Sequence, residues 1–231
     1  MIHRARSFWH WPGLRQLGYS ALLSVITALW FELIYSGTNI IAAQYPRRVR
    51  LHFDVELSLP FVPATVLLYL SLYLLFAAAP FILRSRRELR ALAATMAAMT
   101  ACAALGFLAL PADSAFPAPG YMGIWTAPVH FARAVALEHN FLPSLHVALS
   151  VACVDILAGY AGVAGKVLLW LWGLAICAST MLLHQHYVAD VVTGFALGLA
   201  GARWGYRRWV VQPRAVEARE ANLSRGPGQQ A

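Results

Sequence analysis

Two short polar segments stand out in this chain because their residue types could carry out nucleophilic and acid–base chemistry. The first is Pro143-Ser144-Leu145-His146, and the second, about forty residues later, is His186-Tyr187-Val188-Ala189-Asp190. The four-residue spacing of His186 and Asp190 puts both side chains on one face of a helix. There the carboxylate would hold the imidazole in one tautomer and make His186 a better nucleophile.

The composition indicates that these segments lie in a membrane protein. Of the 231 residues, 60% are hydrophobic and 12% are charged, which is too apolar for an ordinary soluble domain. Because about 20 apolar residues cross a hydrocarbon core of about 30 Å, the sequence predicts an all-α, polytopic bundle of six transmembrane helices. The predicted spans are residues 19–41, 61–83, 89–110, 142–161, 166–183 and 187–206.

The division between the last two spans follows from length. Residues 166–202 are nearly unbroken apolar sequence without proline. As one helix they would be about 55 Å long, nearly twice the hydrocarbon thickness, so the chain must fold back. The polar residues available for this reversal are His184-Gln185-His186, which places the second polar segment at a membrane surface.

Three regions are expected along the chain. Residues 1–18 combine arginines with Phe8, Trp9 and Trp11 and read as an interfacial segment. Residues 19–208 form the six-span domain, and residues 209–231 read as a disordered cytoplasmic tail. The long loop at 111–140, with an amphipathic stretch at its end, is expected to be either a lid or an interfacial connector.

The distribution of basic residues predicts the orientation. With both termini inside, the inner segments carry 14 of the 18 Lys and Arg residues and the outer segments carry four. Both polar segments then face the exterior, or the periplasm if the protein lies in a bacterial inner membrane, as its alanine- and arginine-rich composition suggests. Because the basic residues flank spans and form no stripe, we expect membrane lipids as partners and no nucleic acid.

The first polar segment resembles an anion site. Pro143 suits the first turn of a helix, Asn140 could help to cap it, and the backbone N–H groups from Ser144 to His146 would face an anion. His146 could then protonate the leaving oxygen of a phosphate ester while His186 attacks phosphorus. This chemistry requires no metal.

The chain resembles the type 2 phosphatidic acid phosphatase superfamily, including its inositol phosphorylceramide synthase-like branch. The resemblance covers about residues 50–208 and is carried by three segments: FDVELSLPFVPATVLLYLSLYLLF at 53–76, FLPSLHVALS at 141–150 and STMLLHQHYVADVVTGFALG at 179–198. It implies a six-span lipid phosphatase or phosphotransferase without a metal cofactor. It also implies His186 as nucleophile, Asp190 as its partner, His146 as acid and Ser144 as a phosphate contact.

The sequence departs from the superfamily pattern where phosphate-binding arginines are expected. Phe116-Pro117-Ala118-Pro119 has alanine in place of one arginine and lacks the upstream lysine, and Ser179-Thr180 has threonine in place of another. Since a phosphate site needs positive charge, other residues must supply it. The candidates are His184, Arg133 and the arginines between Arg47 and Arg50.

The leading hypothesis is a lipid phosphatase acting on phosphatidic acid, phosphatidylglycerol phosphate or an isoprenyl phosphate or diphosphate. A phosphotransferase that passes the headgroup to an alcohol acceptor, and a lipid-binding or transport protein without catalysis, are the alternatives. Two acidic residues fall inside predicted spans, where charge is costly. Asp155 is expected to be a structural partner near the inner surface, and Glu32 has no assigned role.

Overall fold

The computed structural model describes residues 8–210, and within that range it contains helices and no strands, which confirms the all-α class. The α-helices are α1 (Leu14–Ala43), α2 (Val66–Leu70), α3 (Leu72–Ile82), α4 (Arg86–Ala109), α5 (Thr126–Ala136), α6 (Leu145–Ala158), α7 (Val163–Leu182) and α8 (Val188–Ala200). The shorter elements are η1 (Asp54–Ser58), η2 (Pro63–Thr65), η3 (Gly123–Trp125) and the π-helical η4 (Gly201–Tyr206). Predictions for residues 1–7 and 211–231 lie outside the described residues.

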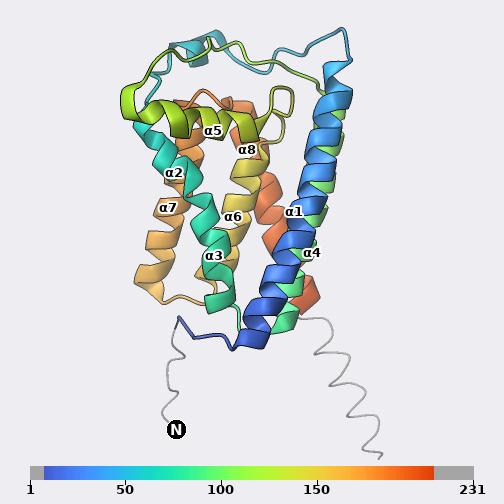
Figure 1. The fold of residues 1–231 in the computed structure, drawn as a ribbon, viewed down its shortest axis with the longest axis vertical. Helices are drawn as coiled ribbons and strands as arrows, with labels where there is room; N and C mark the ends of the chain where they lie inside the picture. The colour runs from blue at the N-terminus through green and yellow to red at the C-terminus, as the bar shows by residue number, and fades with distance from the viewer. Residues whose placement is uncertain (1–7, 211–231) are drawn as a thin grey trace, which may run out of the picture.

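The long helices run side by side and α5 lies across one end of the bundle (Figure 1). α6 forms the centre, because every residue of this helix except His146 is buried. α1 packs along α4, while α3, α7 and α8 surround α6. The turns between α7 and α8 and before α6 therefore lie together at the end covered by α5.

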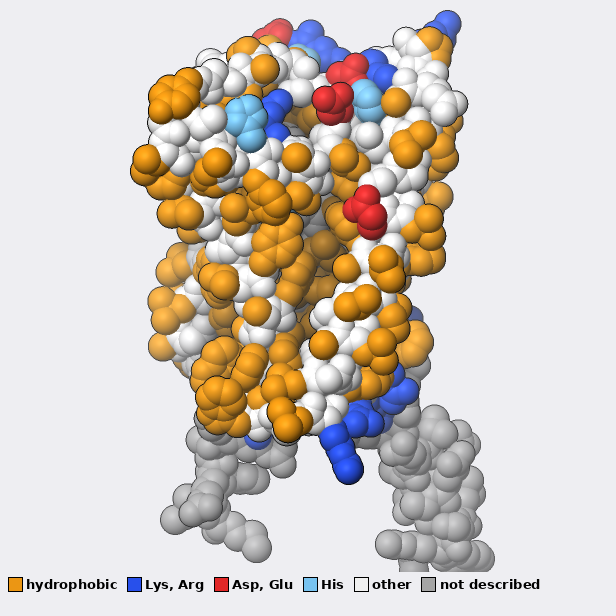
Figure 2. Space-filling view, in the orientation of Figure 1, with side chains coloured by type: hydrophobic (Ala, Val, Ile, Leu, Met, Phe, Trp, Pro, Cys, Tyr) orange, Lys and Arg blue, Asp and Glu red, His pale blue; other side chains and the backbone are white. Residues whose placement is uncertain are grey.

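Four helical segments are long and apolar enough to cross a membrane: α1, Pro63–Ile82, α4 and α7. α6 is apolar but shorter, and the sixth predicted span is divided between α8 and η4. All six predicted spans are thus helical, although α1 begins at Leu14 and includes part of the predicted surface segment. On the face shown in Figure 2, hydrophobic side chains form a band across the middle of the molecule, and most of the charged side chains lie near its two ends.

Two glycines bring α8 directly against the backbone of α6. A Cβ atom on Gly194 would lie 2.4 Å from the Ser144 carbonyl oxygen, and one on Gly198 would lie 2.5 Å from that of Ala148. Small residues four apart allow this approach in membrane helices. The amide of Ser144 also donates a hydrogen bond of 3.0 Å to the carbonyl of Asp190. The starts of α6 and α8, which carry the two polar segments, are therefore held together.

The chain reverses after α7 at the predicted place. His184 has a φ of 56°, and its amide donates to the Met181 carbonyl while the Gln185 amide donates to the Thr180 carbonyl, both at 2.9 Å. These two bonds form a Schellman motif with His184 in the left-handed position that glycine usually takes. Histidine adopts this conformation more readily than most residues, so the polar residues that interrupt the apolar sequence also end the helix.

Polar contacts at the opposite end join the helices that finish there. Asp155 of α6 lies 2.9 Å from an Arg207 guanidinium nitrogen, and Tyr206 and Glu88 both bond the hydroxyl of Tyr160. Asp155 is therefore a structural partner, as expected, and it is not part of the cavity described below.

Candidate active site

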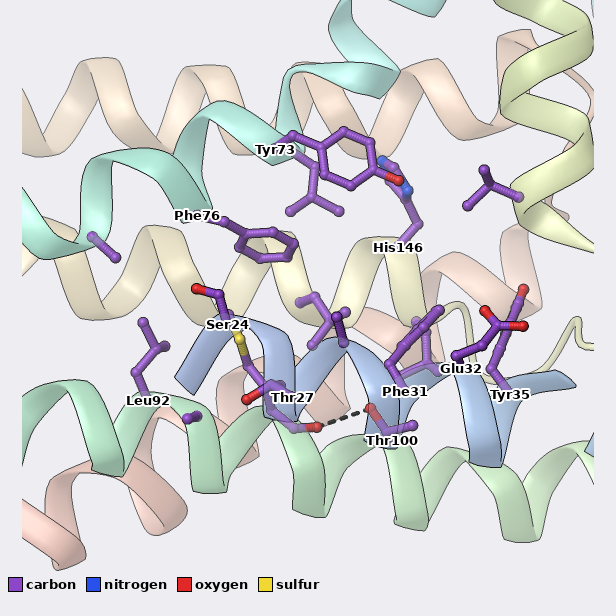
Figure 3. Close-up of a pocket in the computed structure, with 18 of the residues that line it drawn as sticks. Ser24, Thr27, Phe31, Glu32, Tyr35, Tyr73, Phe76, Leu92, Thr100 and His146 are labelled. Atoms are coloured by element: carbon purple, nitrogen blue, oxygen red, sulfur yellow. Dashed lines mark hydrogen bonds between the residues drawn. The ribbon is translucent and has the colours of Figure 1, made fainter. Parts of the chain in front are cut away.

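A cavity of about 480 Å³ connects the two polar segments. Its walls come mainly from α1, α3, α4 and α6, and the surface is hollowed between α3 and α1 (Figure 2). His146 and His186 both line this cavity, so two imidazoles from different elements reach the same space. His146 and Tyr73 lie on the side opposite the α1 residues (Figure 3).

His186 is held by the residues around it. Its side chain is 6% exposed, and its Nδ1 lies 3.4 Å from Oδ2 of the fully buried Asp190. The same carboxylate oxygen accepts a bond of 2.9 Å from the Tyr187 amide, which fixes it at the start of α8. Because Asp190 accepts at Nδ1, the lone pair of the neutral imidazole lies on Nε2. This is the tautomer that a nucleophilic histidine needs.

His146 is fixed by α2. Its Nε2 lies 2.8 Å from the carbonyl oxygen of Tyr69, and its ring stacks on the Tyr69 ring with 3.7 Å between centroids. Since a carbonyl only accepts hydrogen bonds, Nε2 carries a hydrogen. Nδ1 has no hydrogen-bond partner among the described residues, so it is the nitrogen available for a proton transfer.

Two sequence-predicted contacts lie behind the cavity wall. Ser144 is fully buried and caps α6 by accepting a bond from the Val147 amide. Helix α6 therefore begins at Leu145, after the proline, and Pro143 is not in its first turn. Asn140 is buried and donates a bond of 2.7 Å to the Tyr35 carbonyl, so it ties the α6 start to α1. Neither residue lines the cavity.

The comparison with known families agrees with this geometry. The family model of the PAP2 superfamily matches residues 111–213, a segment that includes both polar segments and α5. This match supports membership of the PAP2 superfamily. None of the curated proteins and none of the solved structures matches it significantly. Membership indicates a lipid enzyme of the phosphatase or phosphotransferase type.

The two positions where the superfamily pattern would have arginine differ in their surroundings. Ala118 is exposed, whereas Thr180 is fully buried and bonds the Cys177 carbonyl of its own helix. The Thr180 carbonyl accepts the amides of Gln185 and His186. Thr180 therefore holds the turn that carries His186 and does not face the cavity.

Most of the proposed substitute cations are used elsewhere. His184 bonds the Leu59 carbonyl at 3.0 Å and stacks on Phe116, outside the cavity lining. Arg48 caps the end of α1 and contacts Asp113, and Arg50 pairs with Asp54. The structure does not bring these three residues to the histidines.

Arg133 differs from the other candidate cations. It is half-buried on α5 and has no ion pair or hydrogen bond among the described residues. Ala136, three residues further along the helix, lines the cavity. Arg133 itself does not line the cavity, but residues three apart share a helical face, so Arg133 lies on the same side of α5 as Ala136.

The long loop that precedes α5 is anchored to the second polar segment. The Tyr187 hydroxyl accepts a bond of 2.7 Å from the Ala115 amide, and the buried Tyr187 ring stacks on Phe116 and Phe141. This aromatic contact holds the loop before α5 over the start of α8.

Glu56 is a positioning residue that the sequence did not indicate. It is 4% exposed, and its two carboxylate oxygens accept the amides of Val188 and Phe53, each at 2.6 Å. Val188 is the first residue of α8, so this carboxylate accepts a hydrogen bond from one of the free N–H groups at the start of the helix. Its negative charge also interacts favourably with the positive end of the helix dipole. Glu56 thus ties η1 to the helix that carries Asp190.

Replacing Glu56 with glutamine is expected to lower the free energy of unfolding by about 1–3 kcal/mol, because one buried amide then faces an NH₂ group and loses its acceptor. Thermal unfolding of the purified protein in detergent measures this loss. Asp54→Asn is the matched control, since Asp54 lies in the same short helix but forms only an exposed pair with Arg50, worth at most about 1 kcal/mol. Equal stability of the two variants would contradict the buried bridge.

Proposed function

We propose that this protein is an integral membrane lipid phosphatase that forms a phosphohistidine on His186. The observation that carries this proposal is the meeting of His146 and His186 at one cavity, with Asp190 buried behind His186. Superfamily membership supports the reaction class. The proposed substrates are phosphatidic acid, phosphatidylglycerol phosphate and isoprenyl phosphates.

The reaction follows from the roles of the three side chains. Nε2 of His186 attacks phosphorus, and the bond between phosphorus and the ester oxygen breaks. Protonated His146 gives its proton to the leaving oxygen, which releases the lipid alcohol. His146, now neutral, takes a proton from water as that water attacks the phosphohistidine, and inorganic phosphate leaves. Asp190 stabilises the charge that develops on His186.

The cavity suits a lipid tail below the reacting phosphate. Along α1 it extends from Ser20 to Tyr35, a distance of about 22 Å at 1.5 Å per residue. One leaflet of a hydrocarbon core is about 15 Å thick, so an extended tail fits within the cavity. The hollow between α3 and α1 gives that tail a lateral entrance.

We also propose that all six helical segments span a bacterial inner membrane, with both termini in the cytoplasm. α6 is short but lies inside the bundle, and α8 continues through η4. The starts of α1, α4 and α7, together with η4, carry most of the basic residues, and this favours their end as the cytoplasmic one. The histidines then face the periplasm.

Arg133 is the proposed phosphate-binding cation. Arg133→Ala is expected to lower kcat/KM for a lipid phosphate by about tenfold to a hundredfold, because charge-assisted hydrogen bonds to phosphate are among the stronger polar contacts. Arg133→Lys should recover part of the loss. Arg47→Ala is the control, since Arg47 is an exposed arginine that is not on α5. Unchanged kinetics of Arg133→Ala would exclude this role.

The fate of the phosphoryl group tests the proposal against its alternatives. The purified protein is incubated with a lipid carrying a labelled phosphate, with and without alcohol acceptors. Label released as inorganic phosphate supports the hydrolase, and label in a new lipid supports the phosphotransferase. No movement of label under either condition favours a lipid-binding protein without catalysis.

A further inference from the structure

Glu32 places a carboxylate in the wall of the substrate cavity. It lies in α1 among cavity-lining residues that include Phe31 and Tyr35, and an acidic side chain interrupts the hydrophobic band beside the hollow (Figure 2). Among the described residues that line the cavity, Glu32 is the one acidic residue. It occupies the wall formed by α1, across the cavity from His146 (Figure 3).

The fold gives Glu32 no structural partner that would explain its position. Within the described residues it forms no ion pair, and its side-chain hydrogen bond comes from Ser36 of the same helix. Its side chain is exposed, so it does not hold two helices together. An acidic residue within a membrane helix is costly, and such residues usually face a substrate or ion path. Glu32 therefore requires a functional explanation.

The position of Glu32 along α1 relates it to a specific part of the substrate. Tyr35 lies three residues nearer the end of α1 that Asn140 contacts, which is about 4.5 Å along the helix axis. The phosphate would lie at the level of His146 and His186, at that end of the cavity. Glu32 lies beside Tyr35 at that same end of the cavity (Figure 3), so it faces the groups next to the phosphate.

Electrostatics restricts what those groups can be. A carboxylate repels a nearby phosphate, and the repulsion is stronger in an apolar cavity than in water. A hydrogen-bond donor between the two anions removes this conflict, because hydroxyl and ammonium groups can bond a carboxylate. Ester oxygens and isoprenyl carbons cannot donate.

We propose that Glu32 is a specificity-determining residue that binds a hydroxyl or ammonium group next to the phosphate-bearing carbon of the substrate. This inference rests on the proposed lipid phosphatase function and narrows its substrate class. Phosphatidylglycerol phosphate has a hydroxyl in that position, whereas phosphatidic acid and isoprenyl phosphates have no donor there. Long-chain 2-amino alcohol phosphates belong to the favoured class.

The test compares substrates that differ only in this donor. The probes are a long-chain alkyl phosphate, its 2-hydroxy derivative and its 2-amino derivative, and the full-length protein is assayed in mixed micelles. We expect wild type to prefer both donor-bearing probes by about tenfold to a hundredfold in kcat/KM. In Glu32→Ala, the ratio of kcat/KM for each donor-bearing probe to that for the alkyl phosphate should fall close to one. Glu32→Gln should retain preference for the hydroxyl probe and lose that for the ammonium probe.

Glu138→Gln is the matched control, because Glu138 is an exposed acid outside the cavity lining. Its two ratios should equal those of wild type. If wild type and Glu32→Ala give equal ratios, the specificity role is wrong. Equal loss on all three probes in Glu32→Ala would also overturn it, since this result would mean that Glu32 supports the cavity for every substrate alike.

Binding separates this inference from the proposed function. The dissociation constants of the same probes are measured with His186→Ala and with the double variant His186→Ala/Glu32→Ala. This measurement does not require either variant to hydrolyse the probe. A donor preference of tenfold or more that disappears in the double variant supports Glu32 whether or not wild type is a hydrolase. Equal constants for all probes overturn the Glu32 role, and absence of wild-type turnover overturns only the hydrolase.

Discussion

Replacing His186 with alanine is expected to reduce lipid phosphate turnover by at least about a thousandfold, because the substitution removes the proposed nucleophile of a covalent mechanism. Asp190 and the Tyr187 amide would remain in contact, so the start of α8 should keep its structure. The loss should therefore appear in kcat, with little change in thermal stability.

Phosphoenzyme trapping gives the direct measurement. Rapid acid-free quenching after mixing with a labelled lipid phosphate should leave label on wild type, with the lability to acid and stability to base that distinguish phosphohistidine from phosphoserine. His186→Ala should carry no label. His130→Ala is the control, because His130 is exposed on α5 and does not line the cavity. Equal turnover by wild type and His186→Ala would end the enzymatic proposal.

The helices and the reversal before α8 could be predicted from the sequence because both depend on local features. The membrane-length limit required a break between residues 166 and 202, and His184-Gln185-His186 supplied the polar residues for it. The spacing of His186 and Asp190 likewise predicted their contact. The spacing of residues along a helix and the length of an apolar segment can both be read from the sequence without knowledge of distant contacts.

The roles of individual residues around the histidines were harder to predict, because they depend on backbone atoms distant in sequence. His184 is a reasonable cation by composition, but its ring bonds Leu59, 125 residues away. Ser144 is a reasonable phosphate ligand, but it caps its own helix. Glu56 lies 132 residues from the amide that it accepts. Neither residue type nor spacing reveals such pairings.

The contact between α6 and α8 likewise depends on residues distant in sequence. Gly194 and Gly198 could be read as a close-packing pair, but their partner helix was not evident. The structure shows that they contact the backbone of α6, and this contact brings the two polar segments together. The geometry of the proposed catalytic site therefore depends on residues that have no chemical function of their own.

Substitution of His146 by glutamine should separate the two chemical steps. Glutamine can still donate to the Tyr69 carbonyl, but it cannot transfer a proton. With an alkyl phosphate, whose leaving oxygen must be protonated, kcat should fall by about 10²–10⁴-fold. With nitrophenyl phosphate, whose leaving group departs without a proton, formation of the phosphohistidine should be largely spared.

Pre-steady-state kinetics would reveal this separation. His146→Gln should release a burst of about one nitrophenol per enzyme and then turn over slowly, because His146 is also needed to activate the water that cleaves the phosphohistidine. The alkyl phosphate should show no burst. A variant that loses both reactions equally would indicate that His146 serves only to hold the cavity in shape through Tyr69. Wild type turns over both substrates, so a burst confined to nitrophenyl phosphate in His146→Gln supports transfer of the His146 proton to the leaving group.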